Sequence, residues 1–418
     1  MSTGPASWPA IGVERTRWTT PWGLTGPAGQ TIDTAVPILL AARPLDLSPA
    51  VRAALAAATD AIRVLDASTT VDLTALAGAL LRSESVASSK IEHLDASQRD
   101  LGLAMLRGVP VHTAAAHVAA NVRAMSAAVA GPGPSLPYHV VDLLHVHRLL
   151  LEADPYEGGW AGRLRTMQNW VGGGDVSPHG ALFVPPAPHR VPGLMDDLVR
   201  FCNRTDLDPV AQAAIAHAQF ETVHPFTDGN GRTGRALVHV VLRRRGLTRR
   251  TVVPVSTVLL ADVDGYFDGL AAFRQGRVEE WVGQFASAAS RAASAGLTLA
   301  DSLAQLRARW QDAVRPRKGS AASVLLEALL RQPVVDIGSV RELVGTIGPV
   351  GTAGKAGAVA DKNLYAALDR LEGAGVLTEL SGAGRNRVWA ALAVLDLLEQ
   401  LEARLGRRSG RDRVQPRS

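Results

Sequence analysis

The chain has 418 residues, of which 47% are hydrophobic and 20% charged. This composition is typical of a globular protein long enough for two or three domains, and it excludes a largely disordered one. The single cysteine, Cys202, excludes a disulfide framework or a cysteine-rich zinc site within one chain. The formal net charge of +5 is modest. The simpler interpretation of this charge is a solvated basic surface, and the more specific alternative is contact with nucleic acid.

The N-terminus lacks the charged segment followed by an apolar segment that marks a secretory signal. The longest early apolar run, Val36 to Ala42, is too short to span a bilayer. We therefore expect a cytoplasmic protein without a membrane-spanning segment. Residues 1–45 are rich in Pro, Gly, Thr and Trp and show no sustained periodicity, which predicts an extended arm that wraps the body.

Apolar residues at helical spacing dominate the chain after this arm, and Ser48 with Pro49 forms a candidate helix start. Alanine, leucine and arginine are frequent, and all three favour helices. The pattern predicts a mostly α fold. The expected helices cover about 48–65, 72–83, 84–93, 95–107, 111–129, 136–152, 193–203, 207–222, 232–245, 262–275, 278–294 and 299–314.

Between residues 158 and 192, glycine, proline and short β-prone pieces replace the helical pattern. Two short apolar runs separated by turn residues predict a small β-hairpin flap. The second run comprises Ala181, Leu182, Phe183 and Val184. The two prolines that follow it end any strand pairing there.

A basic linker, residues 315–319, precedes a distinct unit that extends to about residue 395. The pattern predicts helices over 320–331, 339–344 and 361–373, followed by short strands over 376–380 and 388–390. Helix, helix, helix, hairpin is the order of a winged helix-turn-helix-like domain. Its predicted basic face comprises Lys362, Asn363, Arg370, Arg385 and Arg387. This thin face leaves DNA binding open beside a docking or dimerisation role.

The stretch richest in chemistry is His224-Pro-Phe-Thr-Asp-Gly-Asn-Gly-Arg-Thr-Gly-Arg235, which lies between two predicted helices. Gly229 and Gly231 permit backbone angles that bring N–H groups close to a ligand. The free N–H groups at the start of the following helix favour an anion. The stretch therefore predicts an anion-binding loop, although its residue order is not that of a P-loop.

The charged residues of the same loop complete a set suited to phosphate chemistry. Arg232 and Arg235 carry planar guanidinium groups that match phosphate oxygens. Asp228 offers an oxygen ligand for Mg2+ held jointly with substrate phosphates. His224 is the residue that can accept a proton near neutral pH. These are the parts that a phosphoryl or nucleotidyl transferase needs.

The residues from His224 to Arg235 resemble the signature of Fic-domain proteins, H-x-F-x-[DE]-G-N-G-R-x-x-R, at every defining position. The resemblance extends to Gly162–Arg165, to Phe183–Pro186 and to the segment from Leu80 to about Ser97. It covers most of residues 35 to 290. It implies a protein adenylyltransferase, which transfers AMP from ATP to a hydroxyl of a target protein.

The resemblance also implies a role for each loop residue. His224 takes the proton of the target hydroxyl, which attacks the α-phosphate while pyrophosphate leaves, and Asp228 holds Mg2+. The residues implied in ATP binding are Gly229, Asn230, Gly231, Arg232, Thr233, Gly234, Arg235 and, near the adenine, Tyr266. The segment Ala181 to Val184 resembles the flap that docks the target chain as an added strand.

Ser88 and Glu92 are four residues apart and share one face of a predicted helix, where a structural hydrogen bond is the simplest interpretation. The inhibitory helix of the Fic family reads [ST]-x-x-x-E-[GN]. Ser88-Ser-Lys-Ile-Glu92-His93 fits this pattern except at its last position. By resemblance, Glu92 pairs with Arg235 and denies it to the γ-phosphate. ATP then binds in a pose unfit for in-line attack.

We expect six segments: an arm (1–45), a helical region with the inhibitory helix (46–130), the Fic core (131–255), a helical extension and linker (256–318), the winged-helix-like domain (319–395), and a helix end with a basic tail (396–418). Two other functions stay open. The same site would remove AMP from a target, with Glu92 positioning a water, or residues 319–395 would bind DNA. The expected partners are a target protein and ATP, with DNA and a homodimer open.

Overall fold

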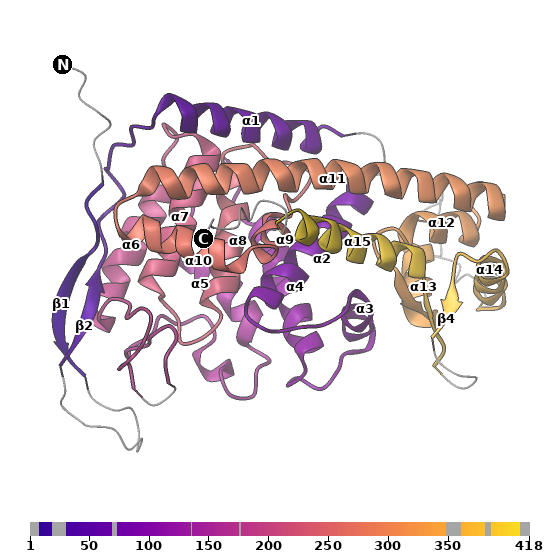
Figure 1. Ribbon diagram of the computed structural model, residues 1–418. Helices are drawn as coiled ribbons and strands as arrows, with labels where there is room; N and C mark the ends of the chain where they lie inside the picture. The colour runs from indigo at the N-terminus through magenta and orange to yellow at the C-terminus, as the bar shows by residue number, and fades with distance from the viewer. Residues whose placement is uncertain are drawn as a thin grey trace, which may run out of the picture. The chain divides into compact units, whose positions relative to one another are not determined.

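The computed structural model describes residues 8–18, 31–68, 73–134, 136–174, 177–347, 361–380 and 386–409 (Figure 1). Arg385 of the predicted basic face and the tail from residue 410 lie outside these ranges. The chain divides into two compact units. Unit 1 comprises Met1–Arg63, Ala120–Arg249 and Asp262–Arg291, and unit 2 comprises Val64–Ala119, Arg250–Ala261 and Ala292–Ser418.

The described part is mostly α-helical, as predicted. Unit 1 holds α5 (Val140–Leu151), η1 (Gly158–Trp160), η2 (Pro188–Arg190), α6 (Val191–Cys202), α7 (Pro209–Val223), α8 (Asn230–Arg244) and α10 (Val263–Arg274). Unit 2 holds α2 (Leu73–Ile91), α3 (Gln98–Arg107), α9 (Val255–Leu260), α12 (Ala321–Ala328), α13 (Ile337–Ile347), α14 (Asp361–Gly373) and α15 (Leu392–Ser409). Three helices contribute residues to both units: α1 (Pro49–Asp66), α4 (Ala114–Ala130) and α11 (Val278–Val314).

The predicted N-terminal arm contains paired strands, which its sequence did not reveal. β1 (Gly12–Arg17) and β2 (Thr31–Val36) form an antiparallel pair that begins with Gly12 opposite Val36. Ile32 and Thr34 are buried while their neighbours Thr31 and Asp33 are exposed, so β2 alternates as a half-buried strand does. The residue types do not show this alternation, because the buried Thr34 is polar and the adjacent Ala35 is buried as well.

A single helix, α2, replaces the two helices expected over 72–83 and 84–93. Ser83 and Glu84, which stand at the expected boundary, are both buried within this helix. The Glu84 carboxylate accepts hydrogen bonds from the Ser256 backbone N–H (2.8 Å) and hydroxyl (2.6 Å). These donors lie in α9, a short helix that the sequence did not predict, and they satisfy the buried acid.

A second continuous helix, α11, replaces those expected over 278–294 and 299–314. Gly296 lies where the break was expected. A Cβ atom built there would lie 3.0 Å from the Leu65 side chain. The glycine therefore permits close helix packing instead of ending the helix. Packing stabilises a helix more than a single glycine weakens it.

The core of unit 1 is built around α7. Asp208 accepts hydrogen bonds from the backbone N–H groups of Val210 (2.8 Å) and Ala211 (3.0 Å), and Pro209 follows it at the first helical position. Every residue from Val210 to Val223 is buried. A helix buried on all sides belongs to the interior of a domain. Its C-terminal end therefore fixes the position of the loop that follows.

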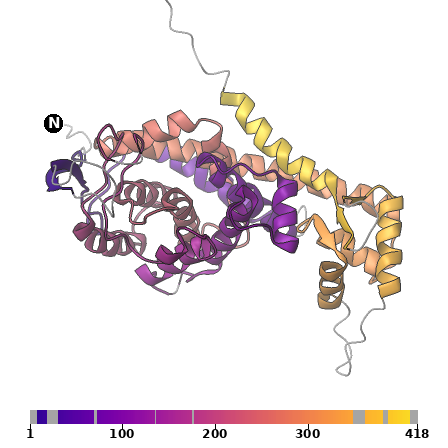
Figure 2. The same cartoon turned by 90° about the horizontal axis from the view of Figure 1, so that it is seen from below.

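The C-terminal part of unit 2 contains a three-stranded antiparallel sheet in the order β3 (Val334–Asp336), β5 (Val388–Ala390), β4 (Thr378–Glu379). β3 was not predicted, and the winged-helix assignment stays a prediction. Figure 2 shows α15, in yellow, continuing after β5 as one helix. Two residues of the predicted basic face have internal partners. Arg387 pairs with Glu379 (2.7 Å), and Arg370 donates to the Val314 and Arg315 carbonyls.

The predicted flap is held by a single β-bridge between Val171 and Phe183. The Val171 N–H donates to the Phe183 carbonyl (2.9 Å), and the Val184 carbonyl accepts from Ala35 of β2 (3.0 Å). The flap is thus attached to the N-terminal strands through one backbone hydrogen bond. Within the ranges that the structure describes, no helix is both long and apolar enough to cross a membrane.

Candidate active site

The loop from His224 to Arg235 joins the buried helices α7 and α8. His224 follows α7 at its C-terminal position in the left-handed conformation, with φ 48°, and its N–H donates to the Phe220 carbonyl (2.8 Å). Residues other than glycine seldom adopt this conformation, although histidine adopts it more often than most of them. The backbone therefore turns sharply at His224, and its side chain is 19% exposed.

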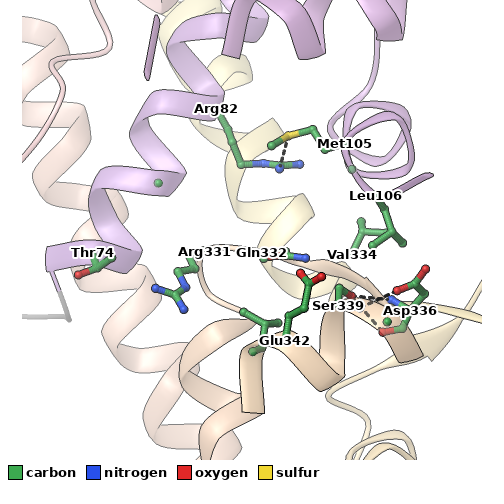
Figure 3. Close-up of a pocket in the computed structure, with 14 residues that line it drawn as sticks. Thr74, Arg82, Met105, Leu106, Arg331, Gln332, Val334, Asp336, Ser339 and Glu342 are labelled. Atoms are coloured by element: carbon green, nitrogen blue, oxygen red, sulfur yellow. Dashed lines mark hydrogen bonds between the residues drawn. The ribbon is translucent and has the colours of Figure 1, made fainter. Parts of the chain in front are cut away.

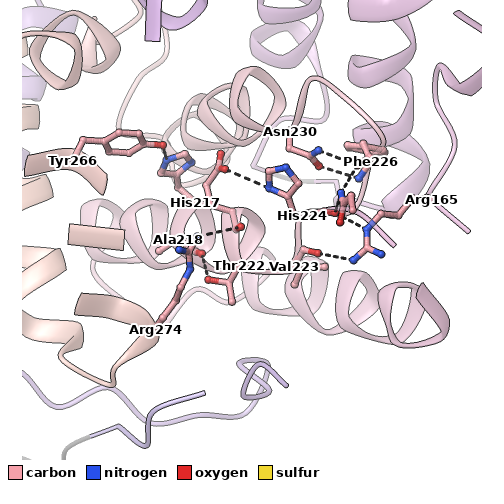
Figure 4. Close-up of polar contacts among 12 residues, drawn as sticks. Arg165, His217, Ala218, Thr222, Val223, His224, Phe226, Asn230, Tyr266 and Arg274 are labelled. Atoms are coloured by element: carbon pink, nitrogen blue, oxygen red, sulfur yellow. Dashed lines mark hydrogen bonds and ion pairs between the residues drawn. The ribbon is translucent and has the colours of Figure 1, made fainter. Parts of the chain in front are cut away.

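Two asparagine side chains, the buried Asn230 and the partly buried Asn169, hold the backbone of the loop in shape. Asn230 uses both ends of its amide on Phe226, accepting from its N–H and donating to its carbonyl, each at 2.9 Å (Figure 4). Asn169 donates to the carbonyls of His224 (3.2 Å) and Phe226 (2.8 Å). The Asn230 side chain, which the resemblance placed in ATP binding, therefore shapes the loop in this structure.

Arg165 is a large, fully buried polar side chain beneath the loop, and the resemblance, which included it in Gly162–Arg165, gave it no role. Its guanidinium donates to the carbonyls of His224 (2.8 Å), Pro186 (2.6 Å) and Met167 (3.1 Å). Burial lowers its pKa to about 10, so it remains charged at neutral pH. Arg165 thereby joins the loop that starts at His224 to Pro186 at the end of the flap. Figure 4 shows its guanidinium on the loop side.

His147 of α5 braces the other side of the loop, and it too was missed. Its Nδ1 accepts from the Gly162 N–H (2.9 Å), so its Nε2 carries the proton and donates to the Asp228 carbonyl (3.1 Å). Its ring stacks on Phe226 at 3.6 Å. Burial lowers the pKa of His147 to about 4, which keeps the ring neutral in this role.

Gly229 marks the start of α8. Its φ of 70° lies in the left-handed region, and a Cβ atom there would meet the Leu150 side chain at 2.8 Å. Both facts require glycine at this position. The turn at Gly229 directs the first N–H groups of α8 toward the loop, where they form an anion-binding end.

The charged residues of the loop are unequally buried. Arg232 is 2% exposed at its side chain, and it donates to a carboxylate oxygen of Asp228 at 3.1 Å. Asp228 is 50% exposed. The arginine is fixed inside the protein, whereas the carboxylate faces outward, where it can hold a metal ion.

His224 faces a second carboxylate within α7. Its Nδ1 lies 4.0 Å from an oxygen of Glu221, which is itself buried. Sequence reasoning did not single out Glu221, although its spacing of three residues on one helix is a usable signal. A carboxylate at this position can stabilise the imidazolium that a general base forms after it has taken a proton.

Tyr266 of α10 lies in an aromatic cluster in the core of unit 1. Its hydroxyl is 2.9 Å from Nε2 of His217 (Figure 4). Its ring also packs beside Trp281. Tyr266 is 1% exposed. Burial, and secondarily the charge of Arg235, lowers the pKa of His217 to about 3. In this structure the Tyr266 ring packs against α7 through His217 and is not exposed to solvent.

The four flap residues differ in exposure. Leu182 is 86% exposed, whereas Ala181, Phe183 and Val184 are partly buried. The guanidinium of Arg274 lies 3.8 Å from the Phe183 ring centroid, a cation–π contact that holds the flap against α10. Leu182 is therefore the flap side chain presented to solvent.

Ser88 and Glu92, the predicted inhibitory pair, belong to unit 2. Ser88 is buried within α2, and Glu92 lies half-buried in the turn that ends that helix. His93 follows with φ 62°. Ser88 therefore lies on the helix and Glu92 just beyond its end, and their inhibitory role stays a prediction.

Residues 137–242 match the family described as Fic/DOC. The match includes the loop from His224 to Arg235, and so it confirms the resemblance of this loop to Fic-domain proteins. A crystal structure of a Fic family protein from Desulfovibrio desulfuricans G20 has the same fold. It is 21% identical, with a TM-score of 0.52, over 83% of this chain and 97% of that chain.

Two curated relatives are also similar. Protein adenylyltransferase fic-1 of Caenorhabditis elegans is 41% identical over 120 residues, which are 28% of this chain and 21% of the relative. Protein adenylyltransferase Fic of Drosophila melanogaster is 39% identical over 111 residues, which are 26% of this chain and 20% of the relative. The chain spans about a fifth of the length of these relatives.

Proposed function

We propose that this protein is a protein adenylyltransferase, which transfers AMP from ATP to a hydroxyl side chain of a target protein. The observation that carries the proposal is the arrangement of one loop. It places His224 at the end of α7 and the N-terminus of α8 after it, with Arg232 of α8 in ion-pair contact with Asp228 of the loop. The names of the two curated relatives support the same activity.

In the proposed reaction His224 is the general base. Because its Nδ1 faces Glu221 at 4.0 Å, Nε2 is the atom that accepts the proton of the target hydroxyl. The hydroxyl oxygen forms a bond to the α-phosphorus of ATP. The bond from that phosphorus to the bridging oxygen breaks, and pyrophosphate leaves with the electron pair. Glu221 stabilises the imidazolium that results.

Fixed positive charge stabilises the phosphates during this step. The N–H groups at the start of α8 and the buried guanidinium of Arg232 are held in place before ATP binds. We assign Arg235 to the β- and γ-phosphates, and the backbone from Gly229 to Gly231, with Thr233 and Gly234, to the same cradle. Buried, pre-oriented charges act more strongly than flexible ones in water.

Asp228 fits the role of a Mg2+ ligand. It is a single, half-exposed carboxylate at the mouth of the anion-binding end. In the part of the chain that the structure describes, no three His, Cys, Asp or Glu side chains form a metal cluster. Mg2+ is commonly bound through one carboxylate together with substrate phosphates and water. When bound, it would neutralise charge on the phosphates.

The flap is proposed to dock the target as an added strand. Residues 181–184 carry one bridge to Val171, and Leu182 presents an apolar side chain to solvent. An extended target segment that pairs with this backbone would bring its hydroxyl residue toward His224. We further propose that Glu92 restrains the activity by pairing with Arg235, as the match to the inhibitory motif suggests.

Labelled ATP distinguishes AMP transfer from phosphoryl transfer and from the removal of AMP. Wild type and Glu92→Gly are incubated with Mg2+ and either α-labelled or γ-labelled ATP in a cell lysate. We expect protein labelling from the α-label alone, with more labelling by Glu92→Gly. Labelling from the γ-label would indicate phosphoryl transfer and contradict the proposal. Release of AMP from labelled protein, weakened by Glu92→Gly, would indicate the reverse reaction as the main activity.

A further inference from the structure

The last helix, α15, joins the C-terminal sheet to α2, the helix that carries the predicted inhibitory residue Ser88. It begins just after β5 and packs against α2, α3 and α9. All of these elements belong to unit 2. At helical spacing along one face, α15 buries Val394, Leu398, Leu401 and Leu405. A single, well-packed helix therefore connects the C-terminal sheet with the helix that ends before Glu92.

An ion pair joins α15 to the last turn of α2. The Lys90 amine lies 2.8 Å from one carboxylate oxygen of Glu402, while the other oxygen accepts from the side-chain amide of Gln98 at 3.2 Å. The Lys90 side chain is 27% exposed and that of Glu402 13%, so water screens this pair less than a surface ion pair. Asp95, which is mostly exposed, faces the same amine at 3.7 Å. Burial by itself lowers the pKa of Lys90, but Glu402 and Asp95 raise it above its usual value, so the amine is charged at neutral pH.

Lys90 also belongs to the turn that carries Glu92. Its carbonyl accepts a hydrogen bond from the His93 N–H, and the Ser89 carbonyl accepts one from the Glu92 N–H, each at 3.0 Å. The side chain of Lys90 is thus attached to α15, while its backbone is part of the turn that fixes the course of the chain at Glu92. Holding Lys90 on α15 therefore restricts the movement of Glu92.

Further from this end, a pocket of about 700 Å³ separates α2 from α13. Arg82 of α2 lies on one side of it and Glu342 of α13 on the other (Figure 3). Arg82 donates there to the sulfur of Met105 of α3 at 3.3 Å, and a thioether is a weak acceptor. Because open space lies between α2 and α13 at this level, the C-terminal part of the chain holds the end of α2 through α15.

We infer that Lys90 and Glu402 are positioning residues, which hold the end of α2 in the conformation that restrains AMP transfer. The C-terminal part of the chain then controls the activity of the loop through α15. This inference rests on the proposed function and on the restraint proposed for Glu92. Loss of the ion pair frees the turn at Glu92, and Arg235 becomes available to the γ-phosphate. Lys90 and Glu402 take no part in the proposed reaction itself.

Reversal of the charges tests the inference, with the full chain, Mg2+ and α-labelled ATP in a cell lysate. We expect protein labelling to rise at least about fivefold in Glu402→Lys and in Lys90→Glu, because like charges replace a charged hydrogen bond. The double variant, Lys90→Glu with Glu402→Lys, restores an ion pair and should return to the wild-type level. Asp396→Lys makes the same change of charge at an exposed position of α15 and should label as wild type does.

Glu92→Gly distinguishes failure of this inference from failure of the proposed function. No labelling by Glu92→Gly would overturn both. Labelling by Glu92→Gly, with both charge-reversed single variants at the wild-type level, would overturn the inference alone. A double variant that stays as active as the single variants would do the same, because the effect would then not depend on the pair. In the Glu92→Gly background, Glu402→Lys should add nothing, and a further increase would contradict action through Glu92.

Amide hydrogen exchange provides a readout that does not depend on labelling. Peptides that contain Glu92 and His93 should exchange at least about tenfold faster in Glu402→Lys than in wild type, because the turn opens more often without the ion pair. The double variant should exchange at the wild-type rate. Unchanged exchange in Glu402→Lys would show that the ion pair does not hold the turn, and would overturn the inference. Circular dichroism establishes that each variant is folded.

Discussion

His93 departs from the inhibitory motif at its last position, and the structure gives that position a backbone role. Its φ is 62°. Its N–H donates to the Lys90 carbonyl and the N–H of Leu94 to the Ser89 carbonyl, each at 3.0 Å. This is the Schellman arrangement, whose left-handed residue is usually Gly and sometimes Asn. Gly or Asn in the family pattern thus suits the left-handed residue that ends the helix. His93 adopts the same left-handed conformation at some cost in backbone strain.

Replacing His93 with glycine should therefore stabilise the protein. A non-glycine residue in the left-handed region costs about 1–2 kcal/mol, and the flexibility of glycine offsets about 0.4–1 kcal/mol of this. We expect His93→Gly to raise the free energy of unfolding in urea by about 0.5–1 kcal/mol. Arg99→Gly, at an exposed helical position of α3, should lower it by about 1 kcal/mol. A destabilised His93→Gly variant would contradict this interpretation.

The lowered pKa of His217 predicts that the free energy of unfolding decreases in acid. Its pKa is about 3 in the folded protein, mainly because of burial, against 6.5 for an ordinary histidine. The lowered pKa means that the unfolded chain binds a proton that the folded chain does not. The contribution of neutral His217 is present above pH 6.5 and is lost as pH falls toward 3.

The expected loss between pH 7 and pH 4 is about 3 kcal/mol from this residue. Urea unfolding at several pH values measures it. His217→Gln, which keeps a hydrogen-bonding group for Tyr266, should be less stable at pH 7 but lose less stability on acidification. Exposed His112→Gln should follow the wild-type curve. A His217→Gln curve parallel to wild type would refute the assignment.

At the scale of secondary-structure elements, the site depends on how closely α7 and α8 pack. Gly234 makes this approach possible. A Cβ atom there would lie 2.6 Å from a carboxylate oxygen of Glu221 and 2.8 Å from the Phe220 ring. The small residue sets the distance between the helix that ends at His224 and the helix that carries the arginines. Its role is therefore to place the two halves of the site.

We expect Gly234→Ala to lower the free energy of unfolding by about 1–3 kcal/mol through overpacking. It should also reduce AMP transfer, because it displaces Glu221 beneath His224. Gly193→Ala in α6 is the matched control, since a Cβ atom there has no neighbour within 4 Å. The control should be neutral or slightly stabilised, by up to about 1 kcal/mol. Equal stability of the two variants would show that α7 and α8 have room to adjust.

At the scale of the whole molecule, the sequence predicted the site residues that are adjacent in the chain. It missed those that become neighbours only when the chain folds. The loop from His224 to Arg235 was predictable, because twelve adjacent residues carry its chemistry. Arg165 and His147 were not, because their partners lie elsewhere in the chain and become neighbours only in the fold. The same reason hid α9, whose Ser256 satisfies Glu84 across a long separation.

Helix boundaries failed where burial overrode local propensity. The expected breaks fall near Ser83 in α2 and near Gly296 in α11, and tertiary partners stabilise both helices there. The mostly α fold class was predictable, because helical periodicity runs through most of the chain. The winged-helix assignment and the six domain boundaries stay predictions.

The central claim is that His224 acts as the base for AMP transfer to a hydroxyl. Mass spectrometry of target proteins after incubation with ATP and Mg2+ tests it most directly, with Glu92→Gly compared to the double variant that also carries His224→Ala. We predict adenylylated hydroxyl side chains with Glu92→Gly and none with the double variant, both proteins having the same circular dichroism spectrum. Equal adenylylation by the double variant would contradict the mechanism.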